Sequence, residues 1–113
     1  FDRLGLSKED ILHKTRRAGM DIIEGKGSTE FGIGRALAEL AGCILRDEKK
    51  ILPVSVLLEG EYGQRDVHCG VPCLIGKNGI EKIIELDLTQ EEQRMLDASC
   101  QVIRTHIQMA AAL

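Results

Sequence analysis

The sequence lacks several features that would place it in a specialised class of protein. No apolar run approaches the ~20 residues that a membrane-spanning helix requires. The formal net charge of -3, from 15 basic and 18 acidic residues, argues against a nucleic-acid or anionic-membrane surface. With 113 residues, of which 43% are hydrophobic and 29% charged, the chain is typical of one globular domain.

The cysteines also lack the spacing of a zinc site or of a disulfide framework. Cys43, Cys69, Cys73 and Cys100 contain no CxxC pair. Cys69 and Cys73 lie in a predicted strand, so their Cα atoms would be ~13 Å apart, whereas a disulfide spans at most about 7 Å. We therefore expect small buried side chains, no metal site, and a reducing, cytoplasmic compartment.

No complete catalytic constellation is present. His13, His68 and His106 each stand alone, so we interpret them as surface or hydrogen-bonded histidines. Ser55 and Ser99 have no sequence context that would activate a nucleophile. The residues by themselves therefore predict no catalytic group in this chain.

Two helical patterns occupy the first part of the chain. Residues 8–24 carry apolar positions at helical spacing, and they follow Ser7 and Asp10, which form a variant of the capping box. The glycines at 25–27 should break or kink this helix.

A second helix should begin after Ser28 or Thr29, either of which can cap it. Its apolar positions recur at helical spacing and are Ile33, Leu37, Leu40 and Ile44. Because further apolar residues flank this stripe, we expect the helix to be heavily buried.

The periodicity then changes from helical to twofold, which predicts strands at 52–58 and 67–75. Pro53 favours an edge position for the first strand because it cannot donate a ladder hydrogen bond. Asn78-Gly79 predicts a type I′ hairpin turn. A third strand should follow over residues 80–88.

The segment from Thr89 to Glu92 forms a full capping box before a last helix. One side of that helix is apolar and consists of Leu96, Cys100, Ile103 and Ile107. The predicted order is therefore helix, helix, three-stranded antiparallel meander and C-terminal helix. This order is typical of an α+β fold with helices packed on one antiparallel sheet.

The junction between the first two helices, residues 25–34, is the most informative stretch. It contains four glycines, and each costs about 1 kcal/mol relative to alanine in a helix interior. They let the backbone bend or let another group approach closely. Thr29 stands at the bend and Ile33 lies one helical turn on, so a hydroxyl and an apolar branch share one face. Thr29 is either a helix cap or a ligand contact.

Several short motifs occur in the same order and at similar spacing in one known family. They are Lys26–Thr29 with Gly32–Gly34, Pro53–Ser55, Gly60–Gln64 with Asp66-Val67, Gly70–Pro72, Asn78–Ile80 and Leu88–Glu92. Together they span nearly the whole chain. The chain thereby resembles the L-lactate dehydrogenases, within the lactate/malate dehydrogenase family, and is most similar to the bacterial ones.

The resemblance implies that residues 1–113 are the C-terminal part of the substrate domain, with the nucleotide-binding Rossmann domain absent. Thr29 would then line the pocket near the bound 2-oxo acid, and Ile33 would pack against the nicotinamide ring. The implied reaction is hydride transfer between NADH and pyruvate, giving L-lactate and NAD, as in glycolysis and fermentation. The family's catalytic histidine and nucleotide-binding loop belong upstream, so we expect this chain alone to be inactive.

The resemblance also implies NAD as cofactor, a 2-oxo or 2-hydroxy acid as substrate, and the remainder of the same polypeptide as partner. It further implies a homo-oligomer, a tetramer in the family, with no nucleic acid and no membrane. Two alternatives stay open. One is a lactate dehydrogenase-like malate dehydrogenase, although these often carry a small residue where Thr29 stands. The other is a non-catalytic α+β assembly or binding module.

Overall fold

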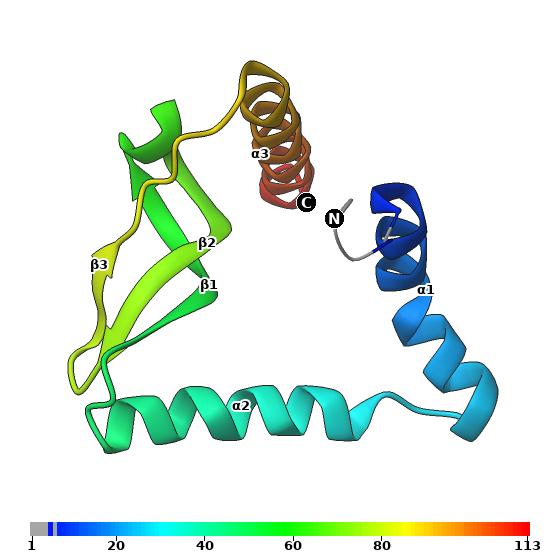
Figure 1. The fold of residues 1–113 in the computed structure, drawn as a ribbon. Helices are drawn as coiled ribbons and strands as arrows, with labels where there is room; N and C mark the ends of the chain where they lie inside the picture. Colours follow the sequence, from blue (N-terminus) through cyan, green and yellow to red (C-terminus); the bar gives the residue numbers. More distant parts are fainter. Residues whose placement is uncertain (1–4, 6) are drawn as a thin grey trace. The chain divides into compact units, whose positions relative to one another are not determined.

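A computed structural model describes residue 5 and residues 7–113 of the chain. This range forms three α-helices, a three-stranded sheet and one short 3-10 helix (Figure 1). The elements are α1 (Lys8–Lys26), α2 (Glu30–Leu45), β1 (Lys50–Glu59), η2 (Glu61–Gly63), β2 (Arg65–Gly76), β3 (Gly79–Ile83) and α3 (Gln90–Ala111). The predicted α+β class and the predicted element order are both confirmed. None of the described helices combines the length and the apolar character needed to cross a membrane.

The chain divides into two compact units, and the division falls inside α2. We call the part up to Glu39 the N-terminal unit and the part from Leu40 onward the sheet unit. The N-terminal unit holds α1 and the first turns of α2. The sheet unit holds the end of α2, the sheet and α3.

Helix α1 begins and ends at the signals that the sequence contains. Ser7 is its N-cap, and the Ser7 hydroxyl accepts a hydrogen bond from the Asp10 N–H at 3.4 Å. The helix ends at Gly27, whose φ of 91° is left-handed and whose N–H donates to the Ile23 carbonyl at 2.7 Å. Such a conformation suits glycine because it has no Cβ. The break therefore falls at the predicted glycines, two residues beyond the predicted end at residue 24.

The expectation that α2 is heavily buried is wrong. Ile33 is 62% exposed and Leu37 is 61% exposed, and Cys43 is the single buried residue of the helix. Leu40 and Ile44, near the C-terminal end, pack against the core of the sheet unit. An apolar stripe indicates that a helix needs a covering surface, but it does not say that the same stretch of chain supplies one. The described residues cover only the last turns of α2.

The sheet is an antiparallel meander in the order β1-β2-β3, as predicted. Pro53 lies on the edge strand β1 opposite Pro72 of the central strand. Because neither proline has an N–H, this pair needs no ladder hydrogen bond between the two residues. The Pro72 carbonyl instead accepts from the Ile84 N–H at 2.9 Å.

Two local predictions for the hairpin and its third strand are wrong. The predicted type I′ turn requires positive φ at both central residues. Gly79 has a positive φ of 83°, but Asn78 is not among the described residues with positive φ. The hairpin register shifts further from the turn, between Leu74 and Ile75. The strand then ends at Ile83, and residues 84–88 leave the sheet without regular structure.

The core lies on one face of the sheet. The side chains of β2 alternate between buried and less buried, and the buried ones are Val67, Cys69, Val71, Cys73 and Ile75. Leu58 of β1, Cys43 of α2 and Cys100 of α3 complete the same cluster. All four cysteines are therefore buried and free, as predicted.

Helix α3 covers this core and begins at the predicted capping box. The Thr89 hydroxyl accepts from the Glu92 N–H at 3.1 Å, and the Glu92 carboxylate accepts from the Thr89 N–H at 2.9 Å. Cys100 is buried, while Ile107 is 53% exposed despite its place in the predicted apolar stripe. The stripe reaches beyond the part of the sheet that α3 covers.

Candidate functional site

The predicted ligand-facing junction lies entirely in the N-terminal unit. Thr29 is half-buried and immediately precedes the first residue of α2. Its neighbour Ser28 donates a hydrogen bond to the Glu30 carboxylate at 2.6 Å. Within the described part of the chain, the Thr29 hydroxyl has no hydrogen-bond partner of its own. Among the described residues the hydroxyl is thus unengaged, and it makes no capping bond to the start of α2.

The first turns of α2 are open to their surroundings. A Cβ added at Gly32 or Gly34 would have no heavy atom within 4 Å apart from the backbone of its own helix and its chain neighbours. These glycines are therefore not required by packing inside the described chain. Ile33 stands between them with 62% of its surface exposed. The arrangement presents an apolar branch on a stretch of helix that another group can approach closely.

A cation also lies at this junction. The Lys26 ammonium sits 4.4 Å from the centre of the Phe31 ring, which is itself 77% exposed. A contact at this distance is a cation–π interaction, which at exposed sites contributes about 0.5–1 kcal/mol. It links the end of α1 to the start of α2 across Thr29.

In the sheet unit, the loop at Gly60–Gln64 is held by hydrogen bonds to other elements. Tyr62 has φ of 56°, a left-handed value that is unusual for a side chain of this size. Its hydroxyl donates to the Ile84 carbonyl at 2.5 Å and accepts from the Leu86 N–H at 2.9 Å. The Gln93 amide donates to the Tyr62 carbonyl at 2.9 Å. The loop therefore fastens the irregular segment after β3 and the start of α3.

Gln64 is the one buried polar residue of the described chain, at 6% exposure. Its amide donates to the Asp97 carboxylate at 2.6 Å, and its carbonyl accepts from the Arg104 guanidinium at 3.2 Å. Arg104 also donates to the Arg65 carbonyl at 2.9 Å. Sequence reasoning missed this network. The sequence feature that could have predicted this network is the helical spacing that places Gln93, Asp97 and Arg104 on one side of α3.

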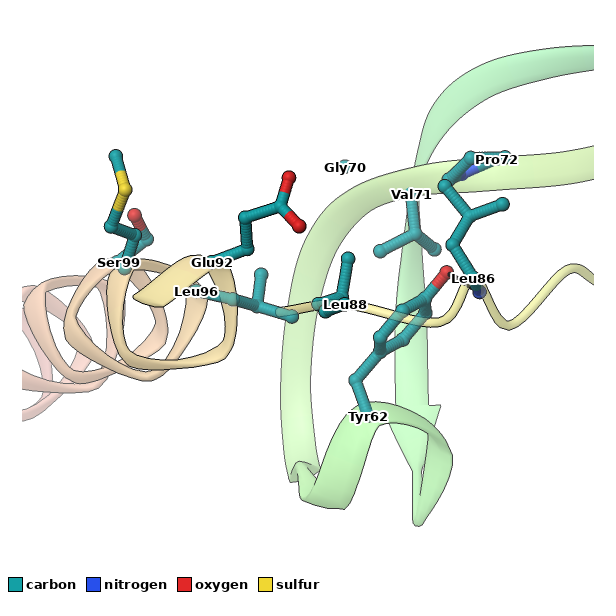
Figure 2. Close-up of a pocket in the computed structure, with 10 residues that line it drawn as sticks. Tyr62, Gly70, Val71, Pro72, Leu86, Leu88, Glu92, Leu96 and Ser99 are labelled. Carbon is teal, nitrogen blue, oxygen red and sulfur yellow. Dashed lines mark hydrogen bonds between the residues drawn. The ribbon is translucent and has the colours of Figure 1, made fainter. Parts of the chain in front are cut away.

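A cavity of about 330 Å³ lies between this loop, β2 and α3. Figure 2 shows Tyr62, Leu88 and Leu96 around it, with Glu92 and Ser99 on α3. The Tyr62 hydroxyl and the Glu92 carboxylate are already engaged in the hydrogen bonds described above. The walls are otherwise mainly apolar. Such a cavity can hold an apolar group, but its lining includes no nucleophile paired with a base.

Three charged side chains at the hairpin, Asp47, Lys49 and Glu81, form a cluster that we call the clamp. The Lys49 ammonium lies 3.0 Å from the Glu81 carboxylate and 3.4 Å from that of Asp47. Asp47 also accepts from the Lys77 N–H at 2.9 Å, and this bond, helped by Lys49, lowers the pKa of the Asp47 carboxyl. The Glu81 and Asp47 carboxylates raise the pKa of Lys49. A Cβ at Gly76 would lie 2.7 Å from oxygens of both carboxylates, so the clamp closes over this glycine.

The histidines and serines considered above remain isolated. His13, His68, His106, Ser55 and Ser99 are all exposed. The His106 ring nitrogen Nδ1 lies 2.8 Å from the Val102 carbonyl of its own helix. No group of three or more acidic, histidine or cysteine side chains in the described residues could hold a metal ion.

Known proteins match almost the whole length of the chain. A family model for the lactate/malate dehydrogenase alpha/beta C-terminal domain matches residues 5–113. The L-lactate dehydrogenase of Mycoplasma pneumoniae is 48% identical over 101 residues, which make up 89% of this chain and 32% of that protein. The malate dehydrogenase of Shouchella clausii is 46% identical over 98 residues, 85% of this chain and 31% of that protein.

Solved structures agree with the sequence matches. The malate dehydrogenase of Aeropyrum pernix has a TM-score of 0.84 and 41% identity, over 91% of this chain and 36% of that one. The malate dehydrogenase of Salinibacter ruber has a TM-score of 0.89 and 36% identity, over 93% of this chain and 35% of that one. The chain spans about a third of the length of these relatives. It belongs to the lactate/malate dehydrogenase family and carries the alpha/beta C-terminal domain of that family.

Proposed function

We propose that this chain is the substrate-side part of an NAD-dependent L-lactate dehydrogenase, which interconverts pyruvate and L-lactate. In the reductive direction, a hydride passes from the nicotinamide of NADH to the carbonyl carbon of pyruvate, and a proton goes to the carbonyl oxygen. The observation that carries the proposal is the Thr29 hydroxyl, which has no hydrogen-bond partner in the described part of the chain, beside the exposed Ile33 at a junction that glycines leave open.

Within this proposal, Thr29 and Ile33 have different roles. The Thr29 hydroxyl would hydrogen-bond the bound 2-oxo acid, and the Ile33 branch would pack against the nicotinamide ring of NAD. One such hydrogen bond contributes only about 0.5–1.5 kcal/mol, whereas enzymes lower barriers by about 8–23 kcal/mol. Thr29 therefore orients the substrate. The catalytic and nucleotide-binding groups would come from the remainder of the polypeptide, so the chain alone should be inactive.

The exposed apolar residues of the N-terminal unit support the proposal that other domains or subunits contact it. Met20, Phe31 and Leu37 are 52%, 77% and 61% exposed, and large exposed apolar surfaces mark interaction sites. We propose that the remainder of the polypeptide and further subunits of a homo-oligomer cover it, in the cytoplasm. The alternative of a non-catalytic assembly module rests on the same exposed residues.

A grafting experiment can distinguish the proposed lactate reaction from the alternative malate reaction. This chain would replace the matching third of the L-lactate dehydrogenase of Mycoplasma pneumoniae and, separately, that of the malate dehydrogenase of Shouchella clausii. We expect the first chimera to keep the larger share of its parent's kcat/KM, because its pocket wall would match the substrate. Greater retention in the malate host would favour the malate reaction. Loss of activity in both folded chimeras would favour the assembly module.

A further inference from the structure

Strand β2 and helix α3 meet through two small thiol side chains. Cys69 lies on the buried face of β2, and Cys100 lies on the side of α3 that covers this face. Both thiols belong to the same buried cluster, and Cys69 lies close enough to Cys100 to raise the pKa of its thiol. Their elements are separate in sequence, so this contact is a point at which a covalent bond would join α3 to the sheet.

The remaining two cysteines are placed differently. The Cys43 thiol donates to the Ile75 carbonyl at 3.2 Å, and the Cys73 thiol donates to the Val71 carbonyl at 3.4 Å. Both residues are 0% exposed, as is Cys100. Cys69 is 8% exposed and is thus the cysteine that a small reagent reaches first. The pair therefore contains one accessible thiol and one enclosed neighbour.

We propose that Cys69 and Cys100 are a redox-active pair that a low-molecular-weight disulfide oxidises to an intramolecular disulfide between β2 and α3. The Cys69 thiolate attacks the reagent and forms a mixed disulfide, which releases one small thiol. The Cys100 thiolate then attacks the Cys69 sulfur and releases the second small thiol. Each protein thiol loses its proton to solvent, and the two electrons reduce the reagent.

The environment of Cys100 sets the conditions for this reaction. Burial raises the pKa of the Cys100 thiol, and the neighbouring Cys69 and the Asp97 carboxylate act in the same direction, whereas Arg104 acts against them. Exchange requires the thiolate. The second step should therefore be slow near neutral pH and faster in alkaline buffer.

The new bond would close a loop that contains the β2–β3 hairpin, residues 84–88 and the first half of α3. A cross-link of this kind restricts the unfolded chain, and it would prevent α3 from separating from the sheet. We expect the oxidised chain to have a higher Tm than the reduced chain, with a return to the starting value after treatment with dithiothreitol.

The test is to incubate the full chain with excess oxidised glutathione in alkaline buffer, alkylate the remaining thiols and digest with trypsin without reduction. Trypsin places Cys69 and Cys73 in the peptide 66–77, Cys100 in the peptide 95–104, and Cys43 in the peptide 36–46. The proposal expects the first two peptides linked, with a total mass two hydrogens below their sum. Fragment ions should assign the link to Cys69.

Variants separate this pair from the other cysteines. Cys73→Ala should keep the link between peptides 66–77 and 95–104, and Cys69→Ala should abolish it. The proposal is overturned if the folded wild-type chain keeps four alkylated thiols, if it holds only mixed disulfides, or if the link runs through Cys73 or Cys43. Because the wild-type digest needs no variant, a Cys69→Ala protein that does not fold leaves the test intact. The result does not depend on the proposed dehydrogenase function.

Discussion

The two units of the chain differ in how far their apolar side chains are buried. Every buried residue in the described range lies in the sheet unit, and no described buried side-chain nitrogen or oxygen lacks a hydrogen-bond partner. In the N-terminal unit, α1 has no buried residue, and Phe31 and Ile33 are largely exposed. The sheet unit thus contains its own core, whereas the N-terminal unit presents a surface that needs a covering partner. The proposed ligand contacts, Thr29 and Ile33, lie in the N-terminal unit.

The sharpest test of this contrast compares two leucines that differ in burial. Leu58 is 0% exposed in the sheet unit, and Leu37 is 61% exposed in α2. Removing a buried leucine side chain costs about 2–5 kcal/mol, so Leu58→Ala should lower the free energy of unfolding by that amount. Leu37→Ala should change it by about 0.5 kcal/mol or less. Urea denaturation followed by circular dichroism measures both, and equal losses would show that the contrast is wrong.

A smaller effect is expected at the buried polar network. Gln64→Ala removes the hydrogen bonds to Asp97 and Arg104, and each such bond contributes about 0.5–1.5 kcal/mol. The matched control is Gln101→Ala, an exposed glutamine on α3. Thermal unfolding should show a lower Tm for the first variant alone. If both variants unfold like the wild type, the network does not hold the loop to α3.

The smallest effect concerns the clamp at the hairpin, because the Asp47 side chain is only partly shielded from solvent, at 36% exposure. Its pKa in the folded chain lies below the ordinary value of 3.8, since the Lys77 N–H and Lys49 stabilise the carboxylate. A lowered pKa contributes stability above the unfolded value, and this is lost as the pH falls through the folded value. Asp47→Asn should therefore flatten the loss of Tm below pH 3.8. The exposed Asp87→Asn should keep the wild-type slope; if Asp47→Asn keeps it too, the clamp is not coupled to folding.

Sequence patterns predicted the elements whose causes are local. The hydroxyls of Ser7 and Thr89 begin their helices because each accepts a nearby N–H, and alternation along β2 follows from its single buried face. The α+β order and the free buried cysteines followed from the same signals. The family resemblance also came from the sequence, since its motifs are short and ordered.

What the sequence did not predict depends on partners distant in the chain. The burial of Gln64 requires Asp97 and Arg104, which lie on another element. β3 ends just before the segment that the Tyr62 hydroxyl contacts through Ile84 and Leu86, and Tyr62 lies far from that segment in sequence. The exposure of α2 was mispredicted because periodicity reports the need for a covering surface and not its source.

The role of Thr29 is the central claim, and kinetics in the lactate host chimera test it most directly. The measurement is the KM for pyruvate after Thr29→Ala and after Thr29→Ser, with Tm recorded for each. Loss of a hydrogen bond of about 0.5–1.5 kcal/mol corresponds to a rise in KM of about 2- to 13-fold. We expect that rise for alanine, a smaller one for serine, and no change in Tm. An unchanged KM for alanine would show that this hydroxyl does not contact the substrate.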